Sequence, residues 1–339
     1  MVINGEKMIN LYYCRGKNFG DRLNKYIFRY LLNEKVISSS FQYGKVIGIG
    51  SILQDFLFEN SNEPEIKKCN EYIHCFSTGI HSEKDFEDLF EIKSLTFRKP
   101  IRFWAVRGKL TFDLLKKYGI SLDDKNVVLG DAGLLVDSVF NVREDKIFDV
   151  GIVPHSHELK YGFFTDLIDV IPNSTILDVR ISPKAFLKKL AQCKSIISTG
   201  LHPLIASDSL RIPNLWIRIS ENYARTSIFK FRDYYSSYGL KVDPLNIKEI
   251  DKNIFFRILD EYKISDELVD KKKSELLNAA SLMKKDILDE HTDNSMVRKN
   301  IMHKLFIEFP YLICIFPKRA IIKLLYSIPK GHRERQYKL

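Results

Sequence analysis

Short apolar runs alternate with helical hydrophobic patterns through the first two thirds of the chain. The run MINLYYC (Met8–Cys14) predicts a buried strand, and Leu23, Ile27 and Leu31 then recur every four residues on one face of a predicted helix. Further strands are predicted by the runs KVIGIG, EYIHCF, IRFWAV and NVVLGDAGLLV, and the helical pattern GKLTFDLLKKYG ends at Gly119. Strands that alternate with helices favour an α/β architecture built on parallel sheets.

A charged segment, NVREDKIFDV (Asn141–Val150), interrupts this alternation, which then starts again. The second series of strands is predicted at DVGIVPHS, TILDVR, SIIST and NLWIRI, and Ser182 and Pro183 supply an N-cap and a first helical residue. From Ile247 to Leu288 the pattern is helical and highly charged. We therefore expect two doubly wound, Rossmann-like domains that face a cleft, with ligands at the carboxyl ends of the strands. The predicted boundaries are 1–145 for the first domain, 146–250 for the second and 251–339 for a helical, basic C-terminal extension.

The net charge of +10 is concentrated in the C-terminal segment. Residues 296–339 hold ten lysines and arginines and two acids, which leaves the rest of the chain close to neutral. A basic nucleic-acid-binding face over the whole protein is therefore not indicated. Within the segment, Ile321, Leu324, Leu325 and Ile328 share one helical face beside basic residues, a pattern typical of a helix in a membrane interface. A terminal helix packed on the first domain is the alternative.

Cysteine usage and hydropathy indicate the compartment. Five cysteines form no C-x-x-C pair and lie mostly in apolar segments, which is typical of reduced, buried thiols in a cytosolic protein. No run of about 20 apolar residues predicts a transmembrane helix, and the first residues lack a signal-peptide pattern. We expect a cytoplasmic protein, placed peripherally on the inner face of the cell membrane if residues 296–339 bind lipid.

The turn after the first strand, KNFGDRLN, carries small and polar residues at the start of a helix. Gly20 permits close approach of the backbone, and Asp21 is an N-cap or first-turn acid. Plain helix capping explains this turn. The functional alternative is contact with an acceptor hydroxyl, with Asp21 or Asn18 as a general base.

Three further turns in the first domain follow predicted strands. GIGSIL (Gly48–Leu53) is rich in glycine but lacks the full G-x-G-x-x-G pattern, so no dinucleotide motif is indicated. STGIH, with Gly79 and His81, suits a backbone that a ligand must approach, although an ordinary tight turn has the same residues. Arg107 directly follows the apolar strand in FWAVRGKLT. An arginine there either pairs with a buried acid or binds a carboxylate or phosphate, and both interpretations stay open.

His202 lies between the strand SIIST and a short helix, just before Pro203. The free N–H groups and dipole of a helix N-terminus favour anions and disfavour an imidazolium, and a bound phosphate dianion would reverse the second effect. A histidine balanced in this way suits a general acid; a histidine satisfied in the core is the alternative. The segment PHSHE holds His155 and His157, which is too weak a pattern to predict a metal site.

Taken together and in order, these segments resemble the polysaccharide pyruvyl transferase family. The matching stretches are GKNFGDRLN, GIGSIL, STGI, FWAVRGKLT with LLKKYGI, VLGDAGLLV, VGIVPHSHE and SIISTGLHPLIASDSLRIPNLWI, and KFRDYYSSYG extends the likeness. The resemblance covers residues 8–220. It implies a two-domain fold like that of the GT-B glycosyltransferases. It also implies transfer of a pyruvyl group from phosphoenolpyruvate onto two hydroxyls of a sugar, as a cyclic ketal, during exopolysaccharide or capsule biosynthesis.

The resemblance also implies roles for individual residues. His202 is expected to be the general acid or phosphate partner, and Asp21 is a weaker candidate for activating an acceptor hydroxyl. The remaining candidates are Arg107, His155, Thr199, Gly200 and Leu201 for the donor and Asn18, Gly20, Asn24, Gly79 and His81 for the acceptor. Some family members carry an arginine at the position of Gly200, and Lys17, Lys109 or Arg180 are candidates to supply the missing cation. No metal or organic cofactor is expected beyond phosphoenolpyruvate as co-substrate, and a lipid-linked oligosaccharide is the expected acceptor.

Two other functions stay open at this stage. A GT-B glycosyltransferase that uses a nucleotide sugar would share the fold, but many retaining members carry glutamates where this chain has TGLHPLIASDSL. A catalytically inactive carbohydrate-binding protein is the third possibility, and His202 and Arg107 argue against it. Release of phosphate from phosphoenolpyruvate, of a nucleoside diphosphate, or of neither distinguishes the three.

Overall fold

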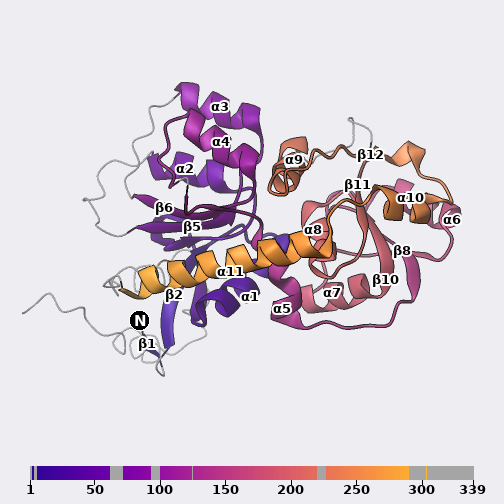
Figure 1. The fold of residues 1–339 in the computed structure, drawn as a ribbon, viewed down its shortest axis with the longest axis horizontal. Coiled ribbons are helices and arrows are strands. Elements are labelled where there is room, and N and C mark those ends of the chain that lie inside the picture. The colour runs from indigo at the N-terminus through magenta and orange to yellow at the C-terminus, as the bar shows by residue number, and fades with distance from the viewer. Residues whose placement is uncertain are drawn as a thin grey trace, which may run out of the picture.

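The computed structural model describes residues 2–3, 6–61, 72–92, 100–123, 125–219, 227–289 and 303. Within these residues the chain forms two separate β-sheets, each covered by helices (Figure 1). The prediction of a mixed α/β protein with two parallel-sheet, Rossmann-like units is confirmed.

The first sheet contains seven strands, and six of them run parallel in the order β3-β2-β4-β5-β6-β7. The short β1 pairs antiparallel with the start of β2. Their bounds are β1 (Val2–Ile3), β2 (Glu6–Tyr12), β3 (Lys35–Ser39), β4 (Val46–Ile47), β5 (Ile73–Thr78), β6 (Ile101–Val106) and β7 (Val128–Leu129). Because β2 lies between β3 and β4, the strand order reverses beside it, and in open parallel sheets ligands bind at this switch point.

The second sheet repeats this strand order. Its five strands run parallel as β9-β8-β10-β11-β12, so the switch point lies between β8 and β10. The bounds are β8 (Phe148–Val153), β9 (Ser174–Ile176), β10 (Cys193–Ser198), β11 (Asn214–Arg218) and β12 (Leu245–Asn246). Both sheets therefore place their preferred ligand positions in the loop after the first parallel strand and the loop after the third.

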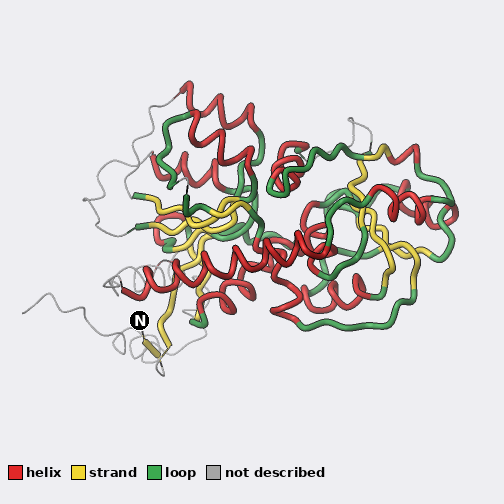
Figure 2. Tube along the Cα trace, viewed as in Figure 1, coloured by secondary structure: helices red, strands yellow, loops and turns green. Residues whose placement is uncertain are grey.

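Helices fill the connections, as the hydrophobic spacing predicts (Figure 2). In α1 (Phe19–Leu32) the predicted face of Leu23, Ile27 and Leu31 is buried. The helix α7 (Pro183–Ala191) is capped by Ser182 and has proline in its first turn, again as predicted. The remaining elements are α2 (Leu53–Ser61), α3 (Glu83–Ile92), α4 (Lys109–Lys117), α5 (Val136–Phe140), α6 (Phe163–Val170), α8 (Leu201–Ser209), α9 (Ile228–Ser236), α10 (Ile254–Glu261) and α11 (Asp266–Asp289), with short 3₁₀ turns η1 (Phe41–Tyr43), η2 (Ala132–Leu135) and η3 (Ile247–Glu249).

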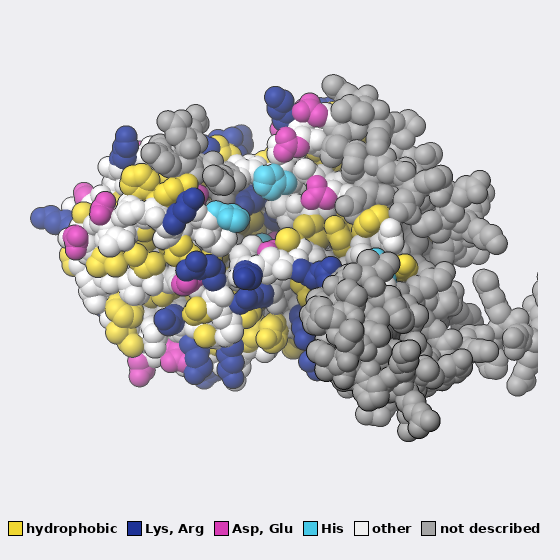
Figure 3. All heavy atoms as spheres, turned by 180° about the vertical axis from the view of Figure 1, so that it is seen from behind, with side chains coloured by type: hydrophobic (Ala, Val, Ile, Leu, Met, Phe, Trp, Pro, Cys, Tyr) yellow, Lys and Arg dark blue, Asp and Glu magenta, His cyan; other side chains and the backbone are white. Residues whose placement is uncertain are grey.

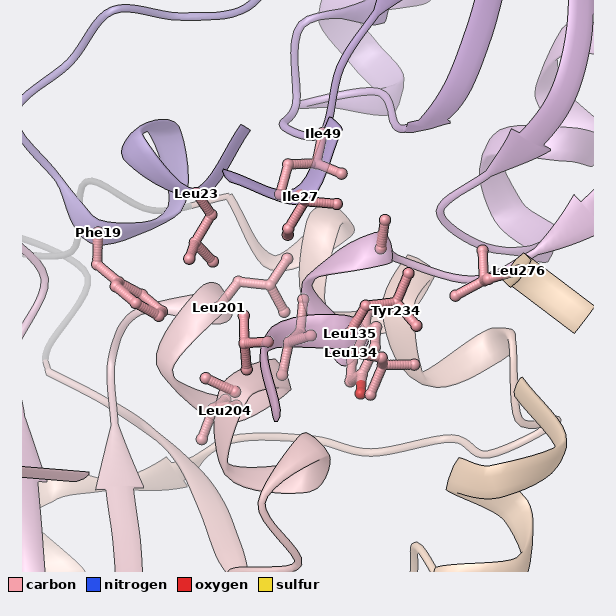
Figure 4. Packing of buried hydrophobic residues seen from close by; sticks show 14 of the residues in the cluster. Phe19, Leu23, Ile27, Ile49, Leu134, Leu135, Leu201, Leu204, Tyr234 and Leu276 are labelled. Carbon is pink, nitrogen blue, oxygen red and sulfur yellow. The ribbon is translucent and has the colours of Figure 1, made fainter. Parts of the chain in front are cut away.

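One apolar core joins the two sheets. Phe19 and Leu23 of α1, in the first unit, share a buried cluster with Leu201 and Leu204 of α8, in the second (Figure 4). The Phe19 ring also lies 4.4 Å from that of Phe186 in α7, measured between ring centroids. Buried apolar surface contributes about 25 cal/mol per Å², so this shared core holds the first turn of α1 against the helices of the second unit.

The long helix α11 runs from the second unit back across the first (Figure 1). It packs on α1 and β6, and Lys273 donates to Asp137 over 2.5 Å and to the carbonyl oxygen of Ser209 over 3.0 Å. Near its other end, Asp286 forms an ion pair with Arg102 of β6. No helix among the described residues is long and apolar enough to cross a membrane. The membrane contact predicted for residues 296–339 lies outside the described residues except at His303, whose ring is 5.7 Å from that of Tyr43.

A buried ion pair ties α9 of the second unit to the first. The Arg107 Nε donates to the Asp233 carboxylate over 2.9 Å, and the two side chains are 1% and 0% exposed. The same carboxylate accepts from the backbone N–H of Thr111 and from its hydroxyl, over 2.8 and 2.7 Å. A side chain at Gly108 would place its Cβ 1.7 Å from the Asp233 carbonyl oxygen, so the two backbones are in direct contact there.

We predict that Asp233→Asn lowers the free energy of unfolding by about 3–5 kcal/mol, because removing one partner of a buried pair leaves the other charge uncompensated. Urea denaturation measures the change. Asp243→Asn, which breaks the exposed pair with Arg232, is the matched control and should leave the midpoint almost unchanged. Equal midpoints for Asp233→Asn and the control would show that the buried pair does not hold α9 in place.

Candidate functional site

The switch points of the two sheets meet where α1 and α8 begin. A Cβ added at Gly20 would lie 2.0 Å from Nδ1 of His202, so the imidazole rests on the bare backbone of α1. Gly20 follows β2 and His202 follows β10, the strands that flank the two switch points. The contact thus joins one predicted acceptor residue to the predicted catalytic histidine.

His202 is the second residue of α8, after the N-cap residue Gly200. Its Nε2 is buried and has no hydrogen-bond partner. Burial lowers the pKa of His202 to about 3, and the nearby positive charges of Lys230 and Arg107 add to this effect. The imidazole is therefore neutral at pH 7, and one of its nitrogens is buried without a hydrogen-bond partner.

The loop after β8 lies against the loop after β10. Thr199 accepts a hydrogen bond from the backbone N–H of His155 over 2.8 Å and donates its own hydroxyl proton to Glu158. Glu158 is only 1% exposed. Burial, followed by the charge of Lys230, lowers the pKa of His155 to about 4. These contacts position a second imidazole near His202, and His155 is among the groups that lower the pKa of His202.

On the first-domain side, Asn18 and Asp21 cap α1 reciprocally. The Asn18 side chain accepts from the backbone N–H of Asp21 over 3.1 Å and donates to its carboxylate over 2.8 Å. A Cβ at Gly16 would lie 2.1 Å from the carboxylate, so the loop backbone also covers it. Burial raises the pKa of Asp21 to about 6, although a hydrogen bond from Cys14 and the charge of Lys230 oppose the shift. Capping and a role as a base at neutral pH are thus both compatible with this geometry.

The other acceptor candidates hold the loops of the first sheet together. Asn24 is buried and donates to the carbonyl oxygens of Asp21 and Ile49 over 3.2 and 3.0 Å. The backbone N–H of His81 donates to the Gln54 side chain over 3.0 Å, and burial followed by the charge of Lys230 lowers the pKa of the imidazole. His81 therefore belongs to the same electrostatic cluster as His202, whereas Asn24 lies in the packed interior beneath it.

The sequence left open whether Arg107 pairs with a buried acid or binds an anion. In the structure it pairs with the buried acid Asp233. Its other contacts are to the Ser51 hydroxyl and to the Ile80 carbonyl oxygen, both over 2.6 Å. A Cβ at Gly79 would lie 2.4 Å from the guanidinium carbon, so glycine is needed there for close approach. Although its N–H groups are largely engaged, the Arg107 charge still acts on His202 and Lys230, where it lowers both pKa values.

Sequence reasoning missed Lys230, the residue that connects this cluster electrostatically. Its positive charge lowers the pKa of His202, His155, His81 and Asp21, which follow four different strands. Burial lowers its own pKa to about 8. The segment KFRDYYSSYG that extended the family likeness begins with this lysine, but nothing in that pattern separates it from a lysine on a solvated helix face.

The three cations proposed from the sequence to replace an arginine at position 200 are all exposed, and two of them have acidic partners. Lys109 forms an exposed pair with Asp113, and Arg180 pairs with Asp178. Lys17 is exposed on the loop before α1.

A hollow of about 440 Å³ lies in the second unit, beside the histidine cluster. Its lining residues are Ser156, His157, Leu159, Lys160 and Arg180. The His157 ring is 5.3 Å from that of His155, so the hollow borders the loop that carries His155. Figure 3 shows histidine side chains between the two halves of the molecule, next to a group of lysine and arginine side chains.

Comparison with known proteins agrees with the likeness seen in the sequence. The uncharacterized protein L143 of Acanthamoeba polyphaga mimivirus is 26% identical over 249 residues, which cover 68% of this chain and 75% of L143. The succinoglycan biosynthesis protein ExoV of Rhizobium meliloti (strain 1021) is 22% identical over 230 residues, which cover 68% of this chain and 64% of ExoV. The solved structure of the functional uncharacterized protein KP1_0663 from Klebsiella pneumoniae has a TM-score of 0.42 at 14% identity, over 67% of this chain and 87% of that one. That structural likeness is too low to support an argument.

A match to a family model covers more than half of the chain. The family model described as polysaccharide pyruvyl transferase matches residues 18–221. This range begins at the N-cap of α1, ends just after β11, and contains His202, Arg107 and Asp21. The chain therefore belongs to the polysaccharide pyruvyl transferase family.

Proposed function

We propose that this pyruvyltransferase of polysaccharide biosynthesis uses phosphoenolpyruvate as donor and converts two hydroxyls of one sugar into a cyclic pyruvyl ketal. The observation that carries the proposal is the meeting of two switch points at the Gly20–His202 contact, where the buried His202 Nε2 has no partner. A donor with a phosphate and a carboxylate suits a site with this excess of positive charge and neutral imidazoles. Family membership supports the reaction class.

In the proposed reaction, the protons taken up by the donor and the phosphate equal those lost by the two hydroxyls. A proton adds to the vinyl carbon of the donor, and the neighbouring carbon becomes oxocarbenium-like and is attacked by the first hydroxyl, which loses its proton. Phosphate then leaves, and the second hydroxyl attacks the same carbon. The first hydroxyl proton replaces the one given to the vinyl carbon, and the second leaves with the phosphate. The residues must therefore supply one acid and one base.

His202 is the proposed acid and Asp21 the proposed base. Because His202 is neutral in the free protein, the donor must raise its pKa on binding, and a phosphate dianion beside the imidazole has this effect. Asp21 lies one residue from Gly20, on the acceptor side of the contact, and is ionised at neutral pH. In this scheme Arg107 contributes its charge to the donor site while its N–H groups brace the loops around it.

The reaction itself is the first test. We predict that the protein releases phosphate from phosphoenolpyruvate only when a suitable glycan is present, and that mass spectrometry finds the glycan heavier by one pyruvyl ketal. A panel of lipid-linked and free oligosaccharides supplies the acceptor. Release of a nucleoside diphosphate from a nucleotide sugar, with no ketal product, would replace this proposal by a glycosyltransferase activity.

His202→Ala is expected to lower kcat by about 100-fold or more, the usual contribution of a positioned acid. His157→Ala removes an exposed histidine from the neighbouring loop and is expected to stay within a few-fold of the wild type. Thermal unfolding should give similar midpoints for both variants, because His202 lies at a turn and has no hydrogen bond through Nε2. Near-normal turnover by a folded His202→Ala protein would show that this histidine is structural.

The raised pKa of Asp21 predicts the acid side of the pH profile. A base must be ionised, so kcat/KM should fall as the pH decreases through about 6. Asp21→Asn should reduce activity strongly and remove this decrease from the residual rate. Phosphate esters also ionise near pH 6. An unchanged acid limb in Asp21→Asn would therefore assign that limb to the donor and exclude Asp21 as the base.

A further inference from the structure

The structure assigns Lys230 to the donor phosphate: we propose that its ammonium, together with His202, binds the phosphate group of phosphoenolpyruvate across the junction of the two sheets. This inference rests on the proposed donor and deepens it, since neither the sequence motifs nor the family match singles out this lysine. Lys230 would supply the positive charge that some family members carry at position 200, where this chain has glycine.

The placement of α9 directs Lys230 toward the site. Lys230 and Asp233 are three residues apart and so share one face of this helix. Asp233 reaches Arg107 and Thr111 in the first unit, and the N–H groups of Lys109 and Leu110 donate to Ser236 one turn later. Lys230 precedes Asp233 by one helical turn, and side chains on a helix lean toward its N-terminus. The Lys230 side chain therefore extends along the same junction, toward the start of α9.

The groups around the Lys230 ammonium confirm this position. Those whose charges act on it or respond to it are Asp21, His81 and Arg107 from the first unit and His155, Glu158 and His202 from the second. Among the described side chains, Arg107 likewise acts on groups from both units, His81 and Asp131 in the first and His202 and Lys230 in the second. The Lys230 ammonium is thus within electrostatic reach of groups that follow strands of both sheets.

Lys230 forms no hydrogen bond or ion pair with any residue that the structure describes, and its ammonium lies 5.4 Å from the ring of the neighbouring Phe231. The two nearby acids have other partners, because Asp21 accepts from Asn18 and Glu158 accepts from Thr199. Together with the orphaned Nε2 of His202, this leaves two nitrogens of one cluster without an acceptor. The buried Nε2 of His202 is costly to leave unpaired, and a phosphate dianion would supply acceptor oxygens both to it and to the Lys230 ammonium.

Electrostatics favour the same ligand. Burial and the Arg107 charge lower the pKa of Lys230 to about 8, and the combined charges help to hold His202 neutral. A dianion between them would stabilise both protonated forms. Donor binding and protonation of the proposed general acid are therefore coupled through one shared anion.

The experiment compares two variants that each remove one positive charge from α9. Lys230→Met alters the face directed to the site, and Arg232→Met alters an exposed residue on the same helix, paired with Asp243. Calorimetry measures the binding of phosphoenolpyruvate, inorganic phosphate and pyruvate to each full-length protein. We expect Lys230→Met to weaken binding of phosphoenolpyruvate and phosphate roughly tenfold or more, with little effect on pyruvate, because hydrogen bonds to charged groups are strong. Arg232→Met should bind all three as the wild type does, and Lys230→Arg should retain most of the affinity.

A second measurement uses the unaltered protein, so it does not depend on the folding of any variant. Acetylation of lysines, quantified by mass spectrometry, should be suppressed at Lys230 by phosphoenolpyruvate and unchanged at the exposed Lys109. Equal weakening by Lys230→Met and Arg232→Met, a loss confined to pyruvate, or unchanged acetylation of Lys230 would each overturn the assignment. If the wild type forms the ketal while Lys230→Met binds the donor normally, only the role of Lys230 fails. If the wild type neither binds nor consumes phosphoenolpyruvate, the proposed donor fails as well.

Discussion

The contact between the backbone of Gly20 and the ring of His202 is the constraint on which the rest of this molecule depends. The space that a Cβ would need at residue 20 is occupied by the imidazole, so the first turn of α1 and the first turn of α8 can approach each other directly. The apolar core around Phe19 and Leu201 maintains this approach, because separating the helices would expose that core to water. The switch points of the two sheets are thereby held at a fixed separation.

Close approach has an electrostatic consequence. It brings Lys230, Arg107 and three histidines into a buried region, where each positive charge makes protonation of the neighbouring groups less favourable. The histidines stay neutral, the pKa of the lysine falls and that of Asp21 rises. Such an arrangement is unfavourable in the empty protein and becomes favourable when an anion is present. Sites that depart from ordinary burial rules in this way are where function is expected.

Arg107 shows how one residue can serve both stability and the site. Its pair with Asp233 fastens α9 to the first unit, and this attachment brings Lys230, one turn away, to the junction. Its contacts with Ser51 and Ile80 brace the loops after β4 and β5. Of the two interpretations that the sequence left open for this arginine, the structure therefore shows pairing with a buried acid, and this pair positions α9, which carries Lys230.

The sequence by itself determined the alternation of strands and helices, the break between two α/β series, the cap at Ser182, and the small-residue turns that carry Gly20, Gly79 and His202, although it left Asp21 as the N-cap or a first-turn acid of the first helix, where the structure has Asn18 as the cap. These features depend on local backbone preferences and hydrophobic spacing, which neighbouring residues largely decide. Only the tertiary structure decided that Asp233 is the partner of Arg107 and that Lys230 lies within electrostatic reach of groups from both units. Those relations join residues more than 100 positions apart or depend on which face of α9 meets the first unit. Their physical reason is packing between elements, which no local pattern records.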